Sequence, residues 1–278
     1  MDTQSVRPLF KQYPGLRHTL PHLALGALPT PVERLDKMEE TLNACDTELH
    51  IKRDDLSGNP YGGNKVRKLE FLLAHAVAHG YKEVLTFGAA GSNHALATAL
   101  YAKPLGLRCI SMLVPQPNSH GLRKNLLLSL HAGAELHYAP GMVPTAFATI
   151  KQLCVHKIRA GKLPYMIPPG GSSPLGLIGF VNAALELRDQ IEAGMLPEPD
   201  SIYAASGTMG TVVGLLLGLQ AAGLPTQVVA VRVTAAQFTS MKKAERLFRD
   251  ANALLHKADS AFPLFPFPHT DFILEHDF

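Results

Sequence analysis

At 278 residues, with 46% hydrophobic and 18% charged residues, the chain has the size and composition of a soluble globular protein with a large core. Its net charge of +3 comes without a stripe of lysine and arginine and without basic residues interleaved with aromatic ones. We therefore expect no nucleic-acid partner. The most apolar stretch, "TVVGLLLGLQAAGL", is too short to span a bilayer and contains a glutamine, so we expect no membrane partner either.

Strands and helices are predicted to alternate along the chain. In chain order we expect a helix after Gly63, a strand at 83–87, a helix at 95–103, a strand at 107–114, a strand at 165–167, a helix at about 177–193, a strand at 201–205, a helix at 212–222 and a strand at 228–233. This alternation predicts an α/β fold with parallel sheets covered by helices. Ligands of such folds bind at the carboxyl ends of the strands. The proline- and phenylalanine-rich tail is expected to be an irregular packed segment.

Three turns between strand and helix, at 88–94, 170–176 and 206–211, are built from Gly, Ser, Thr and Asn. Free backbone N–H groups and the helix dipole make such turns good anion cradles. A dinucleotide site is disfavoured because no acidic residue follows the next strand. A nucleotide-hydrolysing P-loop is also disfavoured, because Asn64 stands at the lysine position of "GNPYGGNKV" and Val66 at the hydroxyl position.

The helix that follows Gly63 begins with three cations, although a helix N-terminus favours anions. Helical spacing predicts that Lys65 and Lys68 share an inward, apolar face and that Arg67 points elsewhere. Partial burial lowers the pKa of a lysine and makes its amine a usable nucleophile, while a second lysine can meet a phosphate. This arrangement suits pyridoxal 5′-phosphate. The alternative is that both lysines extend from a surface helix into solvent.

The motifs "IKRDDLSGNPYGGNKVRKLEFLLAHA" and "GAAGSNHALATA" resemble the D-cysteine desulfhydrase and 1-aminocyclopropane-1-carboxylate (ACC) deaminase family of pyridoxal-phosphate enzymes. "PPGGSSPLGLIGFVNAALEL" and "SGTMGTVVGLLLGL" are similar to later blocks of that family. The resemblance implies a two-domain, tryptophan synthase β-like fold (fold type II). In this fold, residues 1–65 and 161–278 would form a large cofactor-binding domain, with its C-terminal part incomplete. Residues 66–160 would form a smaller inserted βαβ domain.

The resemblance also implies roles for individual residues. Lys65 would form the Schiff base with the cofactor and afterwards move the Cα proton. Lys68 would contact the phosphate, Ser92 the substrate carboxylate and Asn93 the ring oxygen of the cofactor. The predicted catalytic residues are Lys65 and Ser92; the predicted cofactor-binding residues are Asn64, Lys65, Lys68, Asn93, Ala205, Gly207, Thr208, Met209, Gly210 and Thr211; the predicted substrate-binding residues are Ser92, Asn93 and His94.

The activity that the resemblance implies is conversion of a small amino acid to a 2-oxo acid and ammonia. D-Cysteine, which would also release hydrogen sulfide, is favoured, and ACC is the alternative. Two departures bear on this expectation. Gly91 replaces a glutamine that often precedes the Ser-Asn pair, and the sequence stops before the block that supplies an active-site tyrosine and a partner of the pyridine nitrogen. A truncated, catalytically impaired cofactor-binding protein is therefore an alternative of another class.

Other side chains resemble catalytic or metal sites less closely. His75 and His79 have a spacing that can bind a metal, but without a third ligand at motif spacing we predict no metal site. Asp54 and Asp55 are expected to cap a turn or to pair with Lys52 or Arg53. Tyr61 could act near Lys65 or could pack the loop, and it is not among the predicted catalytic residues.

The cysteines and the first residues favour the cytoplasm. Cys45, Cys109 and Cys154 are far apart and odd in number, which disfavours a disulfide framework and indicates a reducing compartment. The start of the chain has Arg7 and Lys11 but no apolar core, unlike a signal peptide. The resemblance adds the expectation of a homodimer.

Overall fold

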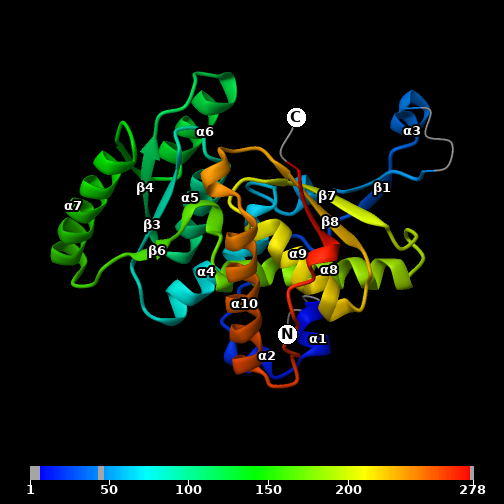
Figure 1. Cartoon of the computed structure of the whole chain (residues 1–278). Helices are drawn as coiled ribbons and strands as arrows, with labels where there is room; N and C mark the ends of the chain where they lie inside the picture. Colours follow the sequence, from blue (N-terminus) through cyan, green and yellow to red (C-terminus); the bar gives the residue numbers. More distant parts are fainter. Residues whose placement is uncertain (1–6, 43–46, 276–278) are drawn as a thin grey trace.

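The computed structural model describes residues 7–42 and 47–275, so Cys45 lies outside the described residues. The helices (Figure 1) are α1 Pro8–Gln12, α2 Leu16–Thr19, α3 Asp36–Leu42, α4 Lys65–Ala78, α5 Asn93–Ala102, α6 His120–His131, α7 Met142–Ala160, α8 Pro174–Glu192, α9 Gly210–Ala222 and α10 Met241–Ala258. The strands are β1 Val32–Arg34, β2 His50–Lys52, β3 Glu83–Ala89, β4 Arg108–Val114, β5 Glu135–Tyr138, β6 Tyr165–Ile167, β7 Ser201–Ser206, β8 Gln227–Arg232 and β9 Phe272–Glu275.

Two parallel sheets carry the fold. Four strands form the first sheet in the order β5-β4-β3-β6, and three form the second in the order β7-β8-β9. The first four residues of β3 are buried, as expected for a central strand that is covered on both faces. The short strands β1 and β2 pair antiparallel. The predicted α/β class with parallel sheets and covering helices is confirmed.

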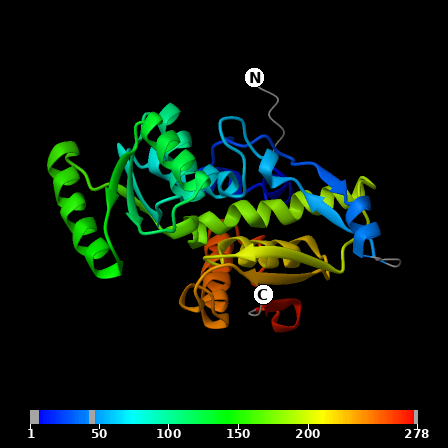
Figure 2. The ribbon, with the colours of Figure 1, turned by 90° about the horizontal axis from the view of Figure 1, so that it is seen from above.

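Helix α8 runs between the two halves of the molecule, as the view from above shows (Figure 2). It begins after Ser173, whose side chain accepts a hydrogen bond from the Gly176 N–H, and Pro174 occupies its first turn. Both α4 and α9 approach it closely. A Cβ at Gly179 would overlap the carbonyl oxygen of Arg67 on α4, and a Cβ at Gly214 of α9 would lie 2.6 Å from the carbonyl oxygen of Leu177. Glycine at these positions therefore allows the helices to pack nearly backbone to backbone.

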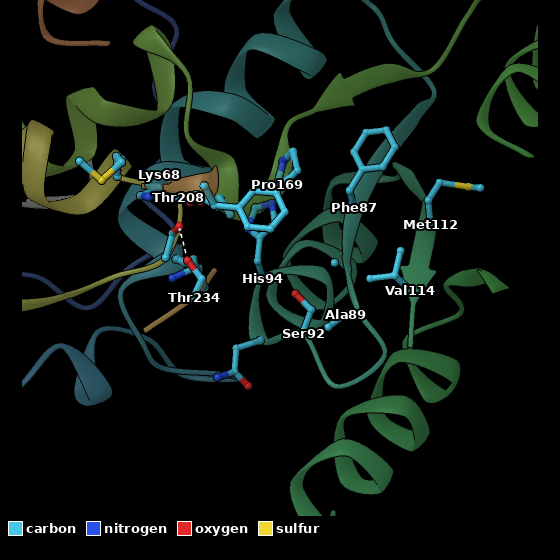
Figure 3. Close-up of a pocket in the computed structure, with 18 of the residues that line it drawn as sticks. Lys68, Phe87, Ala89, Ser92, His94, Met112, Val114, Pro169, Thr208 and Thr234 are labelled. Carbon is cyan, nitrogen blue, oxygen red and sulfur yellow. Dashed lines mark hydrogen bonds between the residues drawn. The ribbon is translucent and has the colours of Figure 1, made fainter. Parts of the chain in front are cut away.

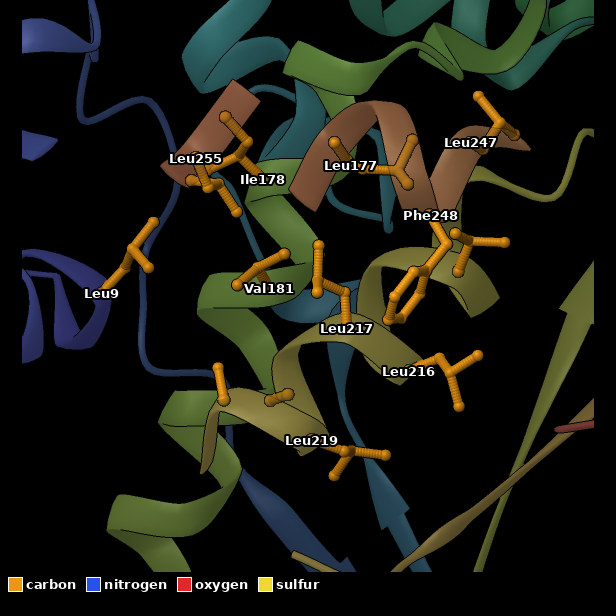
Figure 4. Close-up of a cluster of buried hydrophobic side chains, with 14 of the residues drawn as sticks. Leu9, Leu177, Ile178, Val181, Leu216, Leu217, Leu219, Leu247, Phe248 and Leu255 are labelled. Carbon is orange, nitrogen blue, oxygen red and sulfur yellow. The ribbon is translucent and has the colours of Figure 1, made fainter. Parts of the chain in front are cut away.

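The largest hydrophobic core surrounds this helix (Figure 4). It joins α8, α9, α10 and the N-terminal helices, and its members include Leu9, Ile178, Val181, Leu216, Leu217, Phe248 and Leu255. A second core packs α4 and α5 against the first sheet and includes Val66, Leu69, Leu72 and Val84. Helix α4 thus lies between the two cores, and the residues at its start are held by packing on both sides.

The predicted division into an inserted segment of residues 66–160 and a larger remainder stays a prediction. Strand β6 begins at Tyr165, beyond that segment, and still pairs with β3 of the first sheet. The proline-rich tail is largely irregular, as predicted, but it ends in β9, which pairs with β8. In the described part of the chain, no helix combines the length and the apolar character needed to cross a membrane.

Candidate active site

A pocket of about 880 Å³ opens where strands β3, β4 and β7 end. Its lining includes Ala89 from the end of β3, Val114 from the end of β4 and Ala205 near the end of β7. Figure 3 shows His94 and Ser92 between Lys68 and Thr208 on one side and the apolar Phe87, Met112 and Val114 on the other. A polar wall faces an apolar wall, as in sites that hold a small ring-shaped ligand.

The pocket brings together residues that lie far apart in the sequence. Its lining contains every residue predicted to take part in catalysis, cofactor binding or substrate binding, namely Asn64, Lys65, Lys68, Ser92, Asn93, His94, Ala205, Gly207, Thr208, Met209, Gly210 and Thr211. Their separate roles stay predictions. No aspartate or glutamate is among the described residues that line the pocket, so its charged side chains are cationic.

Lys65 begins α4, directly after the N-cap residue Asn64. Its Nζ donates a hydrogen bond to the Asn64 Oδ1, at 2.5 Å. The Asn64 Nδ2 in turn donates to the Thr211 Oγ1 of α9, at 3.4 Å. Burial lowers the pKa of the Lys65 amine. The lysine is therefore oriented by an amide that is itself tied to the opposite wall, and its neutral, nucleophilic form is favoured.

Lys68 lies one turn further along α4 and is 1% exposed. Its Nζ donates to the Gly170 carbonyl oxygen at 3.2 Å and to the Ser172 Oγ at 3.4 Å. Burial, together with the nearby charges of Lys65 and Lys243, lowers its pKa well below the ordinary value. Within the described chain no carboxylate forms an ion pair with either Lys65 or Lys68. The prediction that both lysines share an inward face is confirmed, and solvent-exposed lysines are excluded.

Ser172 links Lys68 to the loop at the start of α9. Its Oγ accepts the Gly210 N–H at 3.1 Å and lies in hydrogen-bond contact with the Thr208 Oγ1 at 2.7 Å. A Cβ at Gly210 would lie 2.7 Å from the Lys68 Nζ, so a side chain there would fill the space between lysine and loop. Sequence reasoning identified the turn at 170–176 but named no residue in it. The two serines between "PPGG" and "PLG" could have identified Ser172 as a residue of the site.

Asn93 is fixed by a hydrogen-bond relay that also determines which of its atoms faces the pocket. The Asn125 Nδ2 donates to the Gly91 carbonyl oxygen at 2.8 Å and to the Asn93 Oδ1 at 2.7 Å. The Tyr61 hydroxyl donates to the same Oδ1 at 2.9 Å. Because a carbonyl can only accept, the Asn125 atom at Gly91 must be nitrogen, and its partner on Asn93 must be oxygen. The Asn93 Nδ2 is thereby left to donate. The sequence analysis considered Tyr61 near Lys65 but did not connect it with Asn93, and it missed Asn125, which lies in α6.

Ser92 has a structural contact of its own. It is the N-cap of α5, and its Oγ accepts the Ala95 N–H at 3.2 Å. This cap stabilises the helix start by about 1 kcal/mol, and the Ser92 side chain lies in the pocket lining (Figure 3). Oγ can still donate its own hydrogen to an anion while it accepts from Ala95.

His94 is 2% exposed, and neither of its ring nitrogens has a hydrogen-bond partner among the described residues. Burial, reinforced by the charges of Lys65 and Lys68, lowers its pKa to about 3. A neutral imidazole with two unused polar atoms is costly in an apolar surrounding. The ring therefore marks a place where a ligand could supply the missing partner.

Gly91 shows why this chain lacks the glutamine expected before the Ser-Asn pair. A Cβ at this position would lie 2.9 Å from the Leu122 Cα of α6. The Gly91 N–H donates to the Gln116 Oε1 at 2.9 Å. Helix α6 thus leaves no room for a side chain at position 91, and Gln116 from another segment contacts the backbone there instead.

As predicted, Arg67 points away from the pocket face that carries Lys65 and Lys68, but its side chain is buried rather than solvated. Its side chain is 0% exposed and lies in a buried ion-pair network with Asp54 at 2.7 Å and Glu186 of α8 at 2.9 Å. Lys52 also pairs with Glu186, at 2.7 Å. The two cationic neighbours outweigh burial and lower the pKa of Glu186 to about 2. Helix α4 is therefore buried on two sides: one side carries the pocket lysines, and the other carries Arg67 and its ion pairs.

The remaining residues weighed in the sequence have local partners. The rings of His75 and His79 stack with centroids 3.9 Å apart, and the His79 Nδ1 lies 2.9 Å from the His75 carbonyl oxygen. Asp55 pairs with Arg53 at 2.8 Å, as predicted.

Comparison with known proteins agrees with this geometry. Residues 23–260 match the model of a family described as "Pyridoxal-phosphate dependent enzyme". The chain belongs to this family. Its cofactor is accordingly pyridoxal phosphate, and the predicted resemblance is confirmed.

The family's curated members and solved structures include close relatives. A Pyrococcus abyssi protein provisionally named a 1-aminocyclopropane-1-carboxylate deaminase is 35% identical over 242 residues, which cover 87% of this chain and 71% of that protein. A Serratia proteamaculans D-cysteine desulfhydrase is 34% identical over 231 residues, covering 82% and 68%. The crystal structure of an ACC deaminase homologue superposes with a TM-score of 0.79 at 32% identity and covers 97% of this chain and 77% of that one.

The pocket fits the family's cofactor. Its lysines suit a phosphate. A side chain at Gly210 would fill the space beside Lys68. The two ring nitrogens of His94 have no hydrogen-bond partner among the described residues, so they are available to a ligand. Met209, in a left-handed conformation with φ 71°, starts α9 beside these groups. A non-glycine residue in that conformation is a mark of functional sites.

Proposed function

We propose that the protein is a pyridoxal-phosphate-dependent lyase or deaminase acting on a small amino acid. D-Cysteine is the favoured substrate, with pyruvate, ammonia and hydrogen sulfide as products. ACC, opened to 2-oxobutyrate and ammonia, is the second candidate. The names of the relatives with 34–35% identity, one a desulfhydrase and one provisionally a deaminase, support these two substrates equally.

The observation that carries the proposal is the pair of lysines in one pocket, Lys68 buried and Lys65 partly buried, without a carboxylate partner in the described chain. Burial lowers the pKa of both amines, and the charge of Lys65 adds to this effect at Lys68. Such an arrangement is unfavourable in a purely structural site. It becomes favourable when one amine reacts with a carbonyl and the other meets a phosphate.

The assigned roles follow the contacts of each residue. Lys68, Thr208, Ser172 and the Gly210 region would hold the phosphate, because they form one hydrogen-bonded group. The Asn93 Nδ2, left free by the Tyr61 and Asn125 relay, would donate to the ring oxygen. When bound, pyridoxal phosphate supplies an electron sink that stabilises negative charge at the substrate Cα.

Lys65 would move the proton. Its lowered pKa favours a neutral amine that can accept the Cα proton, and the Asn64 Oδ1 fixes where that amine points. Ser92 and His94 would receive the substrate carboxylate, Ser92 by its remaining hydroxyl hydrogen and His94 by its neutral ring N–H.

The test begins with the purified protein after incubation with pyridoxal phosphate. We expect a yellow protein whose visible absorption disappears on borohydride reduction, and release of a 2-oxo acid from D-cysteine. Lys65→Ala should lower this release by at least about 100-fold. Lys37→Ala, which removes an exposed lysine of α3, should leave it unchanged. A wild-type protein that stays colourless would contradict the proposal.

Product analysis separates the remaining alternatives. Pyruvate formed from D-cysteine supports the desulfhydrase, and 2-oxobutyrate formed from ACC supports the deaminase. A yellow protein that releases neither would support the alternative of an impaired cofactor-binding protein. The homodimer and the cytoplasmic location stay predictions. Light scattering of the eluted protein tests the homodimer.

A further inference from the structure

A second cluster of chemistry-bearing side chains lies at the other end of the first sheet. Glu135 and His137 are two residues apart on β5, so they share one face of the strand. His156 and Gln152 are four residues apart on α7, so they share one face of that helix. The strand face and the helix face meet: the Gln152 Nε2 lies 3.2 Å from the His137 Nδ1, and the His156 Nε2 lies 3.5 Å from the Glu135 Oε1.

His156 is held in one orientation by a buried carboxylate. Its side chain is 1% exposed, and its Nδ1 lies 3.0 Å from the Oε1 of Glu83, which is also 1% exposed. An ionised carboxylate only accepts hydrogen bonds, so Nδ1 carries the hydrogen. Arg108 pairs with the same Glu83 and balances its charge.

The other nitrogen of His156 has no hydrogen-bond partner within the described residues. In a neutral ring whose Nδ1 carries the hydrogen, Nε2 presents a lone pair. That lone pair faces the Glu135 carboxylate, so two hydrogen-bond acceptors face each other with no proton between them. A cation placed between the two groups would turn this repulsion into attraction.

We propose that Glu135, His137 and His156 form a zinc site. The Glu135 Oε1 lies 2.8 Å from the His137 Nε2 and 3.5 Å from the His156 Nε2, and one ligand atom from each of the three residues lies within 4.8 Å of the others. Ligand atoms bound to one tetrahedral zinc lie about 3.4 Å apart, given bond lengths of about 2.0–2.2 Å. Two imidazoles and a carboxylate are a zinc donor set, and the nitrogen ligands disfavour magnesium and calcium. Zinc also binds such sites more tightly than iron(II).

The groups behind the ligands support this assignment. A histidine that binds a metal through one nitrogen usually donates the other N–H to a carboxylate or an amide carbonyl. His156 has Glu83 in that position. His137 has Gln152, whose amide oxygen accepts the Nδ1 hydrogen once the amide is turned over.

The position of the site indicates a structural role. Glu83 and Glu135 stand at the amino ends of their strands, whereas the pocket lies at the carboxyl ends. Helix α7, at the left of Figure 1, has few buried side chains but contributes Met142, Thr149 and Leu153 to the pocket wall. A zinc ion would fasten this helix to β5 and so hold one wall of the pocket.

The test uses untagged protein loaded with pyridoxal phosphate, stripped of metals with a chelator and titrated with zinc chloride by calorimetry. We expect one zinc per chain, no comparable binding of magnesium, and an increase of several degrees in the melting temperature in excess zinc. His137→Ala and Glu135→Gln, at partly exposed positions, should each weaken zinc binding at least about 10-fold. Cofactor absorption should be unchanged in both.

The control is the double variant His75→Ala, His79→Ala, which removes the other histidine pair. It should bind zinc as the wild type does. The proposal is overturned if the wild type binds no zinc, if His137→Ala and Glu135→Gln bind it unchanged, or if the control variant loses it.

Discussion

Arg67 and Lys68 are consecutive residues of α4, both almost completely buried, yet their surroundings are opposite in charge. Arg67 contacts Asp54 and Glu186, and these partners hold its pKa above the ordinary value. Lys68 has neutral hydrogen-bond acceptors and the Phe180 ring as neighbours but no carboxylate partner in the described chain, and its pKa falls well below the ordinary value. Arg67 has its counter-charges within the fold, whereas Lys68 has none in the described chain.

The difference shows how a structural charge can be told from a functional one. A buried cation with its own carboxylates is complete without a ligand, and removal of one partner leaves an uncompensated charge. A buried cation without carboxylates destabilises the protein until an anion binds. Substitutions at the two positions should therefore affect different properties.

The largest effect is expected at Arg67. Arg67→Met leaves Asp54 and Glu186 without their main partner, and we expect the free energy of unfolding to fall by about 3–5 kcal/mol. Urea denaturation measures this quantity. Lys68→Met serves as the matched control and should leave the stability of the cofactor-free protein unchanged or raise it. Equal losses in both variants would remove the distinction.

A pH effect of about 3 kcal/mol is expected from His94. The unfolded chain takes up a proton as the pH falls below 6.5, whereas the folded protein, with a pKa of about 3, does not. Stability is therefore present above pH 6.5 and is lost as the pH falls toward 3. At about 1.36 kcal/mol per pH unit, the cofactor-free wild type should lose about 3 kcal/mol more than His94→Gln between pH 7 and pH 4. Parallel pH curves for the two proteins would refute this.

Lys68→Met should weaken pyridoxal phosphate binding by about 10–100-fold, because it removes a charge-assisted contact to the phosphate. Equilibrium titration followed by the visible absorption of the bound cofactor measures the change. Lys37→Ala is the control for a general loss of positive charge. Unchanged affinity in Lys68→Met would mean that this lysine is not the phosphate partner.

The smallest effect is expected in the relay that orients Asn93. Tyr61→Phe removes one of two donors to the Asn93 Oδ1, which should cost about 0.5–1.5 kcal/mol in cofactor affinity. The same titration measures it. Because Asn125 still donates to this oxygen, Asn125→Ala added to Tyr61→Phe should have a larger effect than either alone. A double variant that binds pyridoxal phosphate as tightly as the wild type would show that these hydrogen bonds do not orient Asn93 for the cofactor.

The sequence predicted the local features of the fold better than its long-range pairs. The strands near 83–87 and 228–233 are apolar runs bounded by turns, so pattern alone located β3 and β8. The ion pair of Arg67 with Glu186 was not predictable, because 119 residues separate them. Helical spacing shows which side of α4 carries Arg67, but not which distant helix packs against that side. The N-terminal strands were missed because they are short and none of their residues is buried, and α7, which is largely exposed, was missed as well.

For the site the same contrast holds. The sequence alone predicted the pocket lysines from their helical spacing and the pocket loops from their glycines and hydroxyl side chains. Ser172 and Asn125 act through contacts with Gly210 and Asn93, and such contacts exist only once the chain is folded.

The close packing of α8 with its neighbours has a consequence for binding entropy. Gly179 and Gly214 let α4 and α9 rest against the same rigid helix, so the lysines on one and the loop that begins the other keep a fixed separation. A ligand that contacts both does not have to immobilise two mobile segments when it binds. More of its contact energy therefore remains as affinity, since preorganised sites lose less freedom on association.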